Sequence, residues 1–214
     1  VGHIDSKFGI SIHQMPLLKR IVENTGMNIN GIHMHTGSDI LDIDVFLYAS
    51  EILFNAAENF DNLEFIDFGS GFKVPYKEGD IETNVEELGK KLSKRFNDFS
   101  KKYGKKLTLA FEPGKFLVSE AGQFLVKVNV IKQTTSTVYI CETDTFANNR
   151  RIPEVHEGDV LSFHNAGAYC FTMASNYNSR YRPAEVLWYK GKAHLIRKRE
   201  TFEDILKNQI AIDL

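Results

Sequence analysis

The sequence has little of several features that mark whole classes of protein. It has only two cysteines, Cys141 and Cys170, too few for a disulfide framework. No uninterrupted apolar run approaches the ~20 residues of a membrane-spanning helix, and Val1 does not open a signal peptide. Charge of one sign is also lacking, because 26 Lys and Arg face 28 Asp and Glu without a long basic block. These absences predict a cytoplasmic protein that binds neither nucleic acid nor membranes.

What is present is the composition of an ordinary globular protein. The 214 residues are 43% hydrophobic and 25% charged, enough to bury a core, and they contain no internal repeat or low-complexity segment. Small molecules and other copies of the chain are the expected partners. The first two thirds alternate short apolar runs with longer segments of helical period, an order typical of strand–helix–strand units around a parallel sheet.

Two domains are predicted, an α/β domain over 1–123 and an antiparallel β domain over 124–214. In the first, Met15-Pro16 opens a helix that Gly26 stops, a helix follows over 44–59, and Thr83 with Glu86 forms a capping box for a third helix that reaches Tyr103. The expected strands of both domains are 28–35, 63–68, 107–111, 124–132, 138–141, 159–164, 184–189 and 192–196.

Each strand of the first domain ends in a polar cluster that a plain core strand does not need. The clusters are His33-Met34-His35-Thr36-Gly37-Ser38, Asp67-Phe68-Gly69-Ser70-Gly71 and Glu112-Pro113-Gly114-Lys115. In a (β/α)₈ TIM-type barrel the C-terminal strand ends form the active-site face, so we expect the three clusters to converge on one pocket.

Taken singly, these residues allow other interpretations. His33 and His35 share a strand face and are either core histidines or the start of a metal site, which would make the protein a metal-dependent hydrolase if more ligands joined them. Gly69-Ser70-Gly71 is either a tight turn or a phosphate cradle. A carboxylate before Pro113-Gly114 is commonly a cap or a solvated group. The cluster pattern favours a phosphate-bearing ligand and no metal.

The second domain adds ICETDTF, EGDVLSFHNAGAY, SNYNSRYRPAEV and LIRKRETFEDIL, in which Cys141 and Tyr169 taken alone are interpretable as structural. In order with HMHTGS, DFGSGF and EPGKFLVSEAG, these motifs resemble the diaminopimelate decarboxylases and the wider barrel-type decarboxylases of basic amino acids, of the alanine-racemase-like fold type. The resemblance covers nearly the whole chain. It implies a TIM-type barrel, incomplete here, followed by the β domain.

The resemblance also implies the cofactor, pyridoxal 5′-phosphate, and the roles of the motif residues. Glu112 resembles the partner of the pyridine nitrogen, His35 the imidazole stacked on the ring, and Cys141 the residue that reprotonates the substrate carbon. Glu142 resembles the carboxylate that binds the far end of the substrate. Cys141 and Glu142 reach across the interface of a homodimer in the family. The implied cofactor contacts are His35, Ser38, Gly69, Ser70, Gly71, Glu112, Gly114, Lys115 and Tyr169, and the implied substrate contacts are Glu142, Lys115 and Tyr169.

The pattern departs from the family at several points. Nothing before Ser6 can be the family's cofactor-binding lysine, and Lys7 matches a different position. Between Lys132 and Val138 a Thr/Ser-rich joint stands where the family has a longer stretch with a carboxylate-binding Arg. A barrel alone takes ~250 residues, so we expect a segment to be missing near 133–138 and more polypeptide to precede Val1. Smaller departures are Ser70 for Gly, Lys115 for Arg and Cys170 for Gly.

The Cys141-Glu142 pair followed by Thr143 resembles the enzymes that convert meso-diaminopimelate to L-lysine, the last step of lysine biosynthesis. Alternatives are a decarboxylase of carboxynorspermidine, ornithine or arginine. A further alternative is a catalytically inactive homologue that acts as a binding partner, because the lysine is absent from this sequence. Arg180 and Arg182 are weaker candidates for binding the distal carboxylate.

Overall fold

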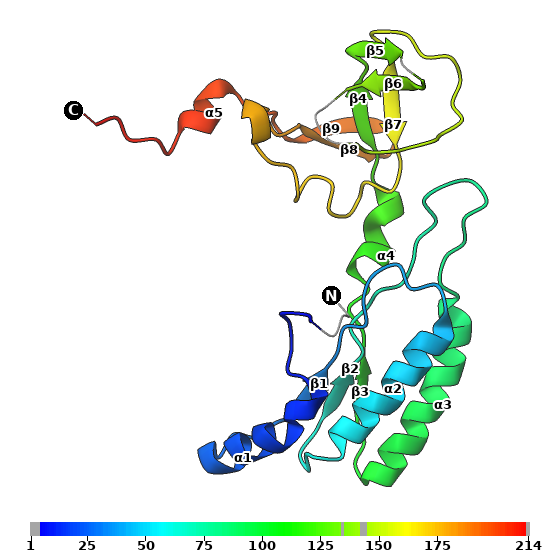
Figure 1. The fold of residues 1–214 in the computed structure, drawn as a ribbon, viewed down its shortest axis with the longest axis vertical. Helices are drawn as coiled ribbons and strands as arrows, with labels where there is room; N and C mark the ends of the chain where they lie inside the picture. The colour runs from blue at the N-terminus through cyan, green and yellow to red at the C-terminus, as the bar shows by residue number, and fades with distance from the viewer. Residues whose placement is uncertain (1–4, 134, 142–144, 213–214) are drawn as a thin grey trace. The chain divides into compact units, whose positions relative to one another are not determined.

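The structure is a computed structural model that describes residues 5–133, 135–141 and 145–212. The chain divides into two compact units, Val1–Leu117 and Val118–Leu214 (Figure 1). The sequence placed the boundary after Gln123, whereas the division falls within the short helix α4 (Gly114–Val118). In the described parts of the chain no helix is both long and apolar enough to cross a membrane.

The first unit contains a parallel sheet in the order β1 (Gly31–His33), β2 (Phe65–Asp67) and β3 (Thr108–Ala110). Each strand is shorter than the apolar run that predicted it. A parallel bridge between Ile40 and Phe72 also joins the segments that follow β1 and β2. The predicted strand–helix–strand order is therefore confirmed, and the three strands do not close into a barrel.

Three helices accompany this sheet: α1 (Met15–Thr25), α2 (Ile43–Ala57) and α3 (Val85–Tyr103), with a 3₁₀ turn, η1 (Ile12–Gln14), before α1. Pro16 lies in the first turn of α1, and Gly26 ends it with φ 67°, as the sequence predicts. The Asp42 carboxylate caps α2 by accepting a hydrogen bond from the backbone N–H of Asp44.

The predicted capping box of Thr83 and Glu86 is wrong. The N-cap of α3 is Asn84, whose side-chain oxygen accepts the backbone N–H at the third helical position, 3.0 Å away. Thr83 is instead buried, with its hydroxyl donating to Ile40 O at 2.6 Å and accepting from Lys73 N at 2.7 Å. Both residues suit a cap, but the Thr83 hydroxyl is used to bind two distant backbone segments.

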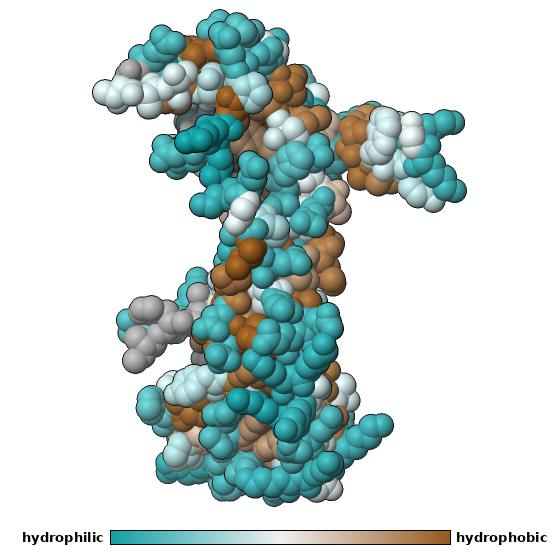
Figure 2. All heavy atoms as spheres, turned by 90° about the vertical axis from the view of Figure 1, so that its right-hand side faces the viewer, coloured by the Kyte–Doolittle hydropathy of each residue, from teal (hydrophilic) through white to brown (hydrophobic). Residues whose placement is uncertain are grey.

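The core of the first unit lies between α2, α3 and the sheet, where the two helices run side by side (Figure 1). The Phe54 ring stacks on Phe99 with centroids 4.5 Å apart and meets Phe68 edge-on at 5.8 Å. Such ring pairs stabilise beyond the area they bury. The outer face of α3 is mostly hydrophilic (Figure 2), as expected of an amphipathic helix with one buried face. Other fully buried members of this core are Phe46, Leu63, Ile66, Leu88 and Leu92.

The second unit consists of antiparallel pairs, as predicted. These are β4 (Phe124–Lys127) with β7 (Val160–Phe163), β5 (Val130–Gln133) with β6 (Thr137–Ile140), and β8 (Glu185–Tyr189) with β9 (Lys192–Arg197). The 3₁₀ turns η2 (Ser119–Ala121) and η3 (Tyr177–Ser179) and the helix α5 (Phe202–Leu206) complete it.

The expected single strand over 124–132 is two strands, because the chain changes neighbours in its middle. The amide of Val128 donates to Asp159 O at 2.8 Å, and the next amide, of Asn129, donates to Ile140 O at 2.9 Å. Gln133 then pairs with Thr137 across the joint where we expected a missing segment. Thr134 lies outside the described residues, so the missing segment stays a prediction.

Candidate active site

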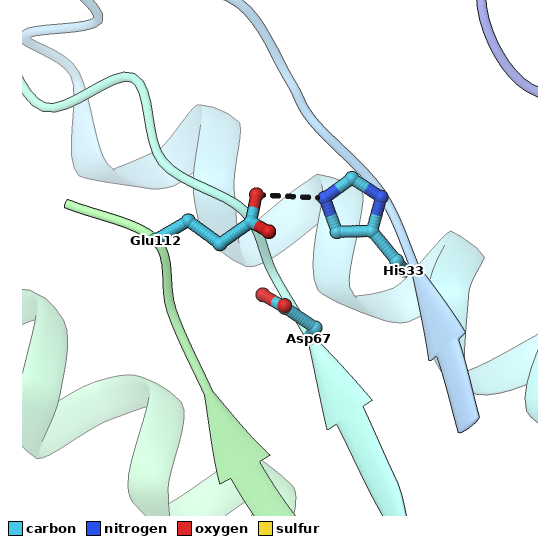
Figure 3. A group of neighbouring side chains, drawn as sticks. All are labelled: His33, Asp67 and Glu112. Atoms are coloured by element: carbon cyan, nitrogen blue, oxygen red, sulfur yellow. Dashed lines mark hydrogen bonds and ion pairs between the residues drawn. The ribbon is translucent and has the colours of Figure 1, made fainter. Parts of the chain in front are cut away.

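The C-terminal ends of β1, β2 and β3 bring three chemical groups together, as the strand-end clusters predict. Parallel register sets His33 beside Asp67, and Glu112 follows two residues after β3. One ligand atom of each residue lies within 4.8 Å of the others. His33 Nε2 and Glu112 Oε2 are 3.1 Å apart and form a hydrogen bond (Figure 3). The two side chains are about half exposed, at 48% and 56%, so this edge of the sheet is open to a ligand.

The Gly69–Gly71 loop is held by all three strand ends. The Asp67 carboxylate accepts the Gly69 N–H at 2.8 Å, and the Glu112 N–H donates to Gly69 O at 2.7 Å. The Ser70 N–H points to His35 Nδ1 at 3.4 Å. Two of the amides predicted to cradle a phosphate therefore already have partners inside the protein. The loop also fixes His35 and Glu112 relative to one another, and its contact with a phosphate stays a prediction.

Gly69 and Gly71 are required by close backbone approach as well as by conformation. Gly69 has φ +61°, and a Cβ there would lie 2.4 Å from Met34 O. Gly71 has φ +119°, and its Cβ would lie 2.4 Å from Gly37 O. Since real Cβ atoms do not approach a carbonyl oxygen so closely, only glycine lets the loop pack directly on the segment after β1.

Ser38 and Thr36, both in the segment after β1, differ in the exposure of their hydroxyl groups. Ser38 is exposed at the surface of the first unit. Thr36, by contrast, has an enclosed hydroxyl oxygen without a hydrogen-bond partner in the described residues. A buried hydroxyl without a partner is destabilising, so Thr36 should lower the free energy of unfolding of the protein.

Lys115 links three segments near the same edge. Its ammonium donates to Asp39 Oδ1 at 2.5 Å and to the Tyr76 hydroxyl at 2.8 Å, and it lies 5.3 Å from the centroid of the Tyr76 ring. Burial lowers the pKa of Lys115, but the hydrogen bonds to Asp39 and Tyr76 raise it, and the net pKa is above the ordinary value. A substrate or phosphate oxygen at Lys115, as the sequence predicts, would compete with Asp39. Gly114, also predicted to contact the cofactor, donates its amide to Glu112 O at 2.7 Å.

Cys141 and Tyr169 lie in the second unit, so their approach to Glu112 stays a prediction. Partial burial raises the pKa of the Cys141 thiol, which keeps its proton on at neutral pH. Tyr169 is 60% exposed and has φ 64°, a conformation unusual for a bulky residue. Glu142 lies outside the described residues.

Arg182, a weaker candidate for binding a substrate carboxylate, already has a carboxylate partner. Its Nε donates to Glu200 Oε1 at 2.6 Å and its backbone N–H to Glu200 Oε2 at 2.8 Å. The backbone hydrogen bond from Arg182 is the main cause that lowers the pKa of Glu200. Asn176 adds a third hydrogen bond to Glu200, at 2.6 Å. Arg182 thus fastens the segment before β8 to the segment after β9.

Sequence reasoning proposed His35, the glycine loop and Glu112 as site residues, but it missed the partners that hold them. Asp67, Asp39 and Tyr76 were not proposed as site residues, and His33 was considered only as a core or metal-binding histidine. The signal for Asp67 was present in the sequence. Asp67 begins the cluster that contains Gly69, and parallel pairing of the strands places it beside His33. His33, Asp67 and Glu112 offer one nitrogen and two carboxylates, a donor set that also suits a metal ion, so geometry alone leaves the metal alternative open.

Comparison with known proteins identifies the family of the chain. Residues 1–119 match the family described as pyridoxal-dependent decarboxylase, pyridoxal binding domain. The diaminopimelate decarboxylase of Methanothermobacter thermautotrophicus is 35% identical over 251 residues, which cover 95% of this chain and 59% of that protein. The corresponding protein of Bacillus subtilis is 29% identical over 258 residues, which cover 96% of this chain and 59% of the relative. The matched stretches exceed the 214 residues of this chain, so these relatives carry residues that the chain lacks.

Solved structures of diaminopimelate decarboxylases are also similar to this chain. The diaminopimelate decarboxylase of Methanocaldococcus jannaschii, crystallised with L-lysine, has a TM-score of 0.82 at 27% identity, over 97% of this chain and 59% of that one. The chain therefore spans about three fifths of the length of the relatives it matches. Because the family match covers more than half of its residues, the chain belongs to the pyridoxal-dependent amino-acid decarboxylases, as do the diaminopimelate decarboxylases to which it is similar.

Proposed function

We propose that the full-length protein uses pyridoxal 5′-phosphate to decarboxylate meso-diaminopimelate to L-lysine, the last step of lysine biosynthesis, in the cytoplasm. The observation that carries the proposal is the Glu112 carboxylate at the end of β3, beside the Gly69–Gly71 loop and bound to His33. The curated relatives are named diaminopimelate decarboxylases, and one related structure holds L-lysine. The open sheet would form part of a (β/α)₈ barrel.

The chemistry of the residues at this edge fits pyridoxal phosphate. The cofactor has a basic ring nitrogen, a flat ring and a phosphate. Glu112 offers a half-exposed carboxylate for the nitrogen, and the His35 imidazole offers a flat surface for the ring. Ser38, which is exposed, adds a hydroxyl for the phosphate. The covalent lysine of the family would come from outside this sequence.

When bound, the cofactor supplies an electron sink for the pair left behind by departing CO₂. Glu112 would hold a proton on the ring nitrogen, because a carboxylate accepts a hydrogen bond from a protonated nitrogen and stabilises its charge. His35 would orient the ring, aided by its contact with the Ser70 N–H. Cys141, whose thiol has a raised pKa, would deliver the proton to the substrate carbon.

Substrate choice would depend on the far end of the substrate, where diaminopimelate bears a second ammonium and a second carboxylate. Glu142 would accept the distal ammonium, with hydrogen bonds worth roughly 1.5–3 kcal/mol. Tyr169 would contact both phosphate and substrate. Lys115 would bind a substrate carboxylate or the phosphate only by giving up Asp39.

A homodimer would complete the site, with Cys141 and Glu142 reaching the partner's pocket. Apolar side chains on β8 and β9 are exposed in this chain, including Trp188 at 71% and Ile196 at 62%, which is compatible with a self-association surface. Light scattering on the full-length protein would measure its mass directly.

The deciding experiment compares CO₂ release from meso-diaminopimelate, ornithine, arginine and carboxynorspermidine. We expect preference for the first. Preference for another substrate would overturn the assignment but keep the decarboxylase, and no release from any of them would favour an inactive homologue. Glu142→Ala should lose most activity with diaminopimelate while cofactor binding persists. Glu112→Gln should bind the cofactor yet turn over slowly, because a neutral amide no longer holds the ring nitrogen protonated.

A further inference from the structure

We propose that His33 is a positioning residue that sets the Glu112 carboxylate for its contact with the cofactor's ring nitrogen. This inference rests on the proposed function and adds to it a residue that acts through Glu112. The observation behind it is the hydrogen bond between His33 Nε2 and Glu112 Oε2, 3.1 Å long, between residues 79 positions apart (Figure 3).

The backbone is fixed at both His33 and Glu112, but the backbone does not fix the conformation of the Glu112 side chain. His33 is in register with Asp67 in the sheet, and the Glu112 N–H is bonded to Gly69 O at 2.7 Å. The glutamate side chain still has three rotatable bonds and is 56% exposed, so without a partner it would sample several rotamers. The hydrogen bond to Oε2 selects one of them, and within the described part of the chain Oε1 has no donor and can accept a second hydrogen bond.

Asp67 makes such a restraint necessary. Its carboxylate lies in the same cluster, within 4.8 Å of the atoms of the other two residues, and like charges repel. The Gly69 N–H occupies Asp67 Oδ1 at 2.8 Å, which ties Asp67 to the loop. His33 therefore counters the tendency of Glu112 to turn away from Asp67. An ionised carboxylate can only accept, so the chemistry assigns the bridging hydrogen to His33 Nε2.

His35 does not share this role. Its Nδ1 faces the Ser70 N–H at 3.4 Å, so the two histidines of the motif serve different partners. One would set the ring plane of the cofactor, and the other would set the carboxylate at the ring nitrogen.

The test uses His33→Leu and His33→Gln in the full-length protein, because the glutamine amide nitrogen can reach the place of Nε2 whereas leucine cannot donate. His13→Leu is the matched control, since His13 is an exposed histidine of the same unit. We measure turnover, KM, the dissociation constant of pyridoxal phosphate, and the absorption spectrum of the bound cofactor. The Leu variant should lose about tenfold to a hundredfold in kcat, the range for a lost hydrogen bond to a charged group, with little change in KM. Its cofactor spectrum should shift, and Gln should recover most of both.

A double-mutant cycle with Glu112→Gln separates positioning from general damage. In the Glu112→Gln background, His33→Leu should add little, because the carboxylate that it positions is gone. Equal losses for Leu and Gln, additive losses in the cycle, or wild-type behaviour of the Leu variant would each overturn the inference. If the wild type binds the cofactor but releases no CO₂ from any basic amino acid, the proposed function fails, and the spectra and dissociation constants of the variants still decide the role of His33.

Discussion

The close packing of the Gly69–Gly71 loop on the segment after β1 can be tested with a pair of matched glycine substitutions. Gly69 and Gly79 both have positive φ, +61° and +75°. A Cβ at Gly69 would meet Met34 O at 2.4 Å, whereas a Cβ at Gly79 would meet nothing within 4 Å. Alanine at either position carries the same conformational cost, so the difference between the two variants isolates the steric contact.

The expected magnitudes follow from these two terms. An alanine in the left-handed region costs about 1–2 kcal/mol, which is the whole cost expected for Gly79→Ala. Gly69→Ala adds overpacking against a carbonyl oxygen, about 1–3 kcal/mol, so its total is about 2–5 kcal/mol. The backbone oxygen cannot rotate away as a flexible side chain can, and the loop must shift. That shift should also loosen the hydrogen bond from the Glu112 amide to Gly69 O.

Urea unfolding of both variants and the wild type measures these free energies, provided that the slopes of the transitions agree. The dissociation constant of pyridoxal phosphate provides a second measure, which should rise for Gly69→Ala and stay unchanged for Gly79→Ala. Equal destabilisation by the two substitutions would refute the argument, because it would show that the loop does not pack as closely as the structure indicates.

Three further predictions concern residues around the same edge. Thr36→Val should raise the free energy of unfolding by up to about 1 kcal/mol, because the methyl group replaces a buried hydroxyl without a partner; a loss of stability in urea unfolding would contradict this. Thr83→Val should cost about 1–3 kcal/mol in the same assay, because Ile40 O and Lys73 N lose their shared hydroxyl, and Thr83→Ser should cost much less. The hydrogen bond from Lys73 is the main cause that lowers the pKa of Asp80 to about 2, below its ordinary value of 3.8. A carboxylate whose pKa is lower in the folded state stabilises the fold at pH values above its ordinary pKa, and this stabilisation is lost as the pH falls toward the folded-state pKa. The free energy of unfolding of the wild type should therefore decline more than that of Asp80→Asn between about pH 4 and pH 2. Parallel declines of the two proteins would count against the ion pair.

Local sequence signals determined the types and order of the elements. Helical period, Pro16 and Gly26 predicted α1, and alternating apolar runs predicted the short strands of both units. The order of the motifs identified the family, which the comparisons confirm. These features are local or sequential, so they can be recognised without knowing which residues meet in space.

Tertiary structure decided which residues work together. His33 with Glu112 and Lys115 with Asp39 are 79 and 76 positions apart, and no local pattern couples them. The N-cap of α3 was also decided by tertiary contacts, because Thr83 and Asn84 are both residue types that suit an N-cap. Burial of the Thr83 hydroxyl between two distant backbone segments left the neighbour to begin the helix. Hydrogen bonds between distant segments form only when the chain packs, because a polar group that becomes buried must find whichever partner the fold brings to it.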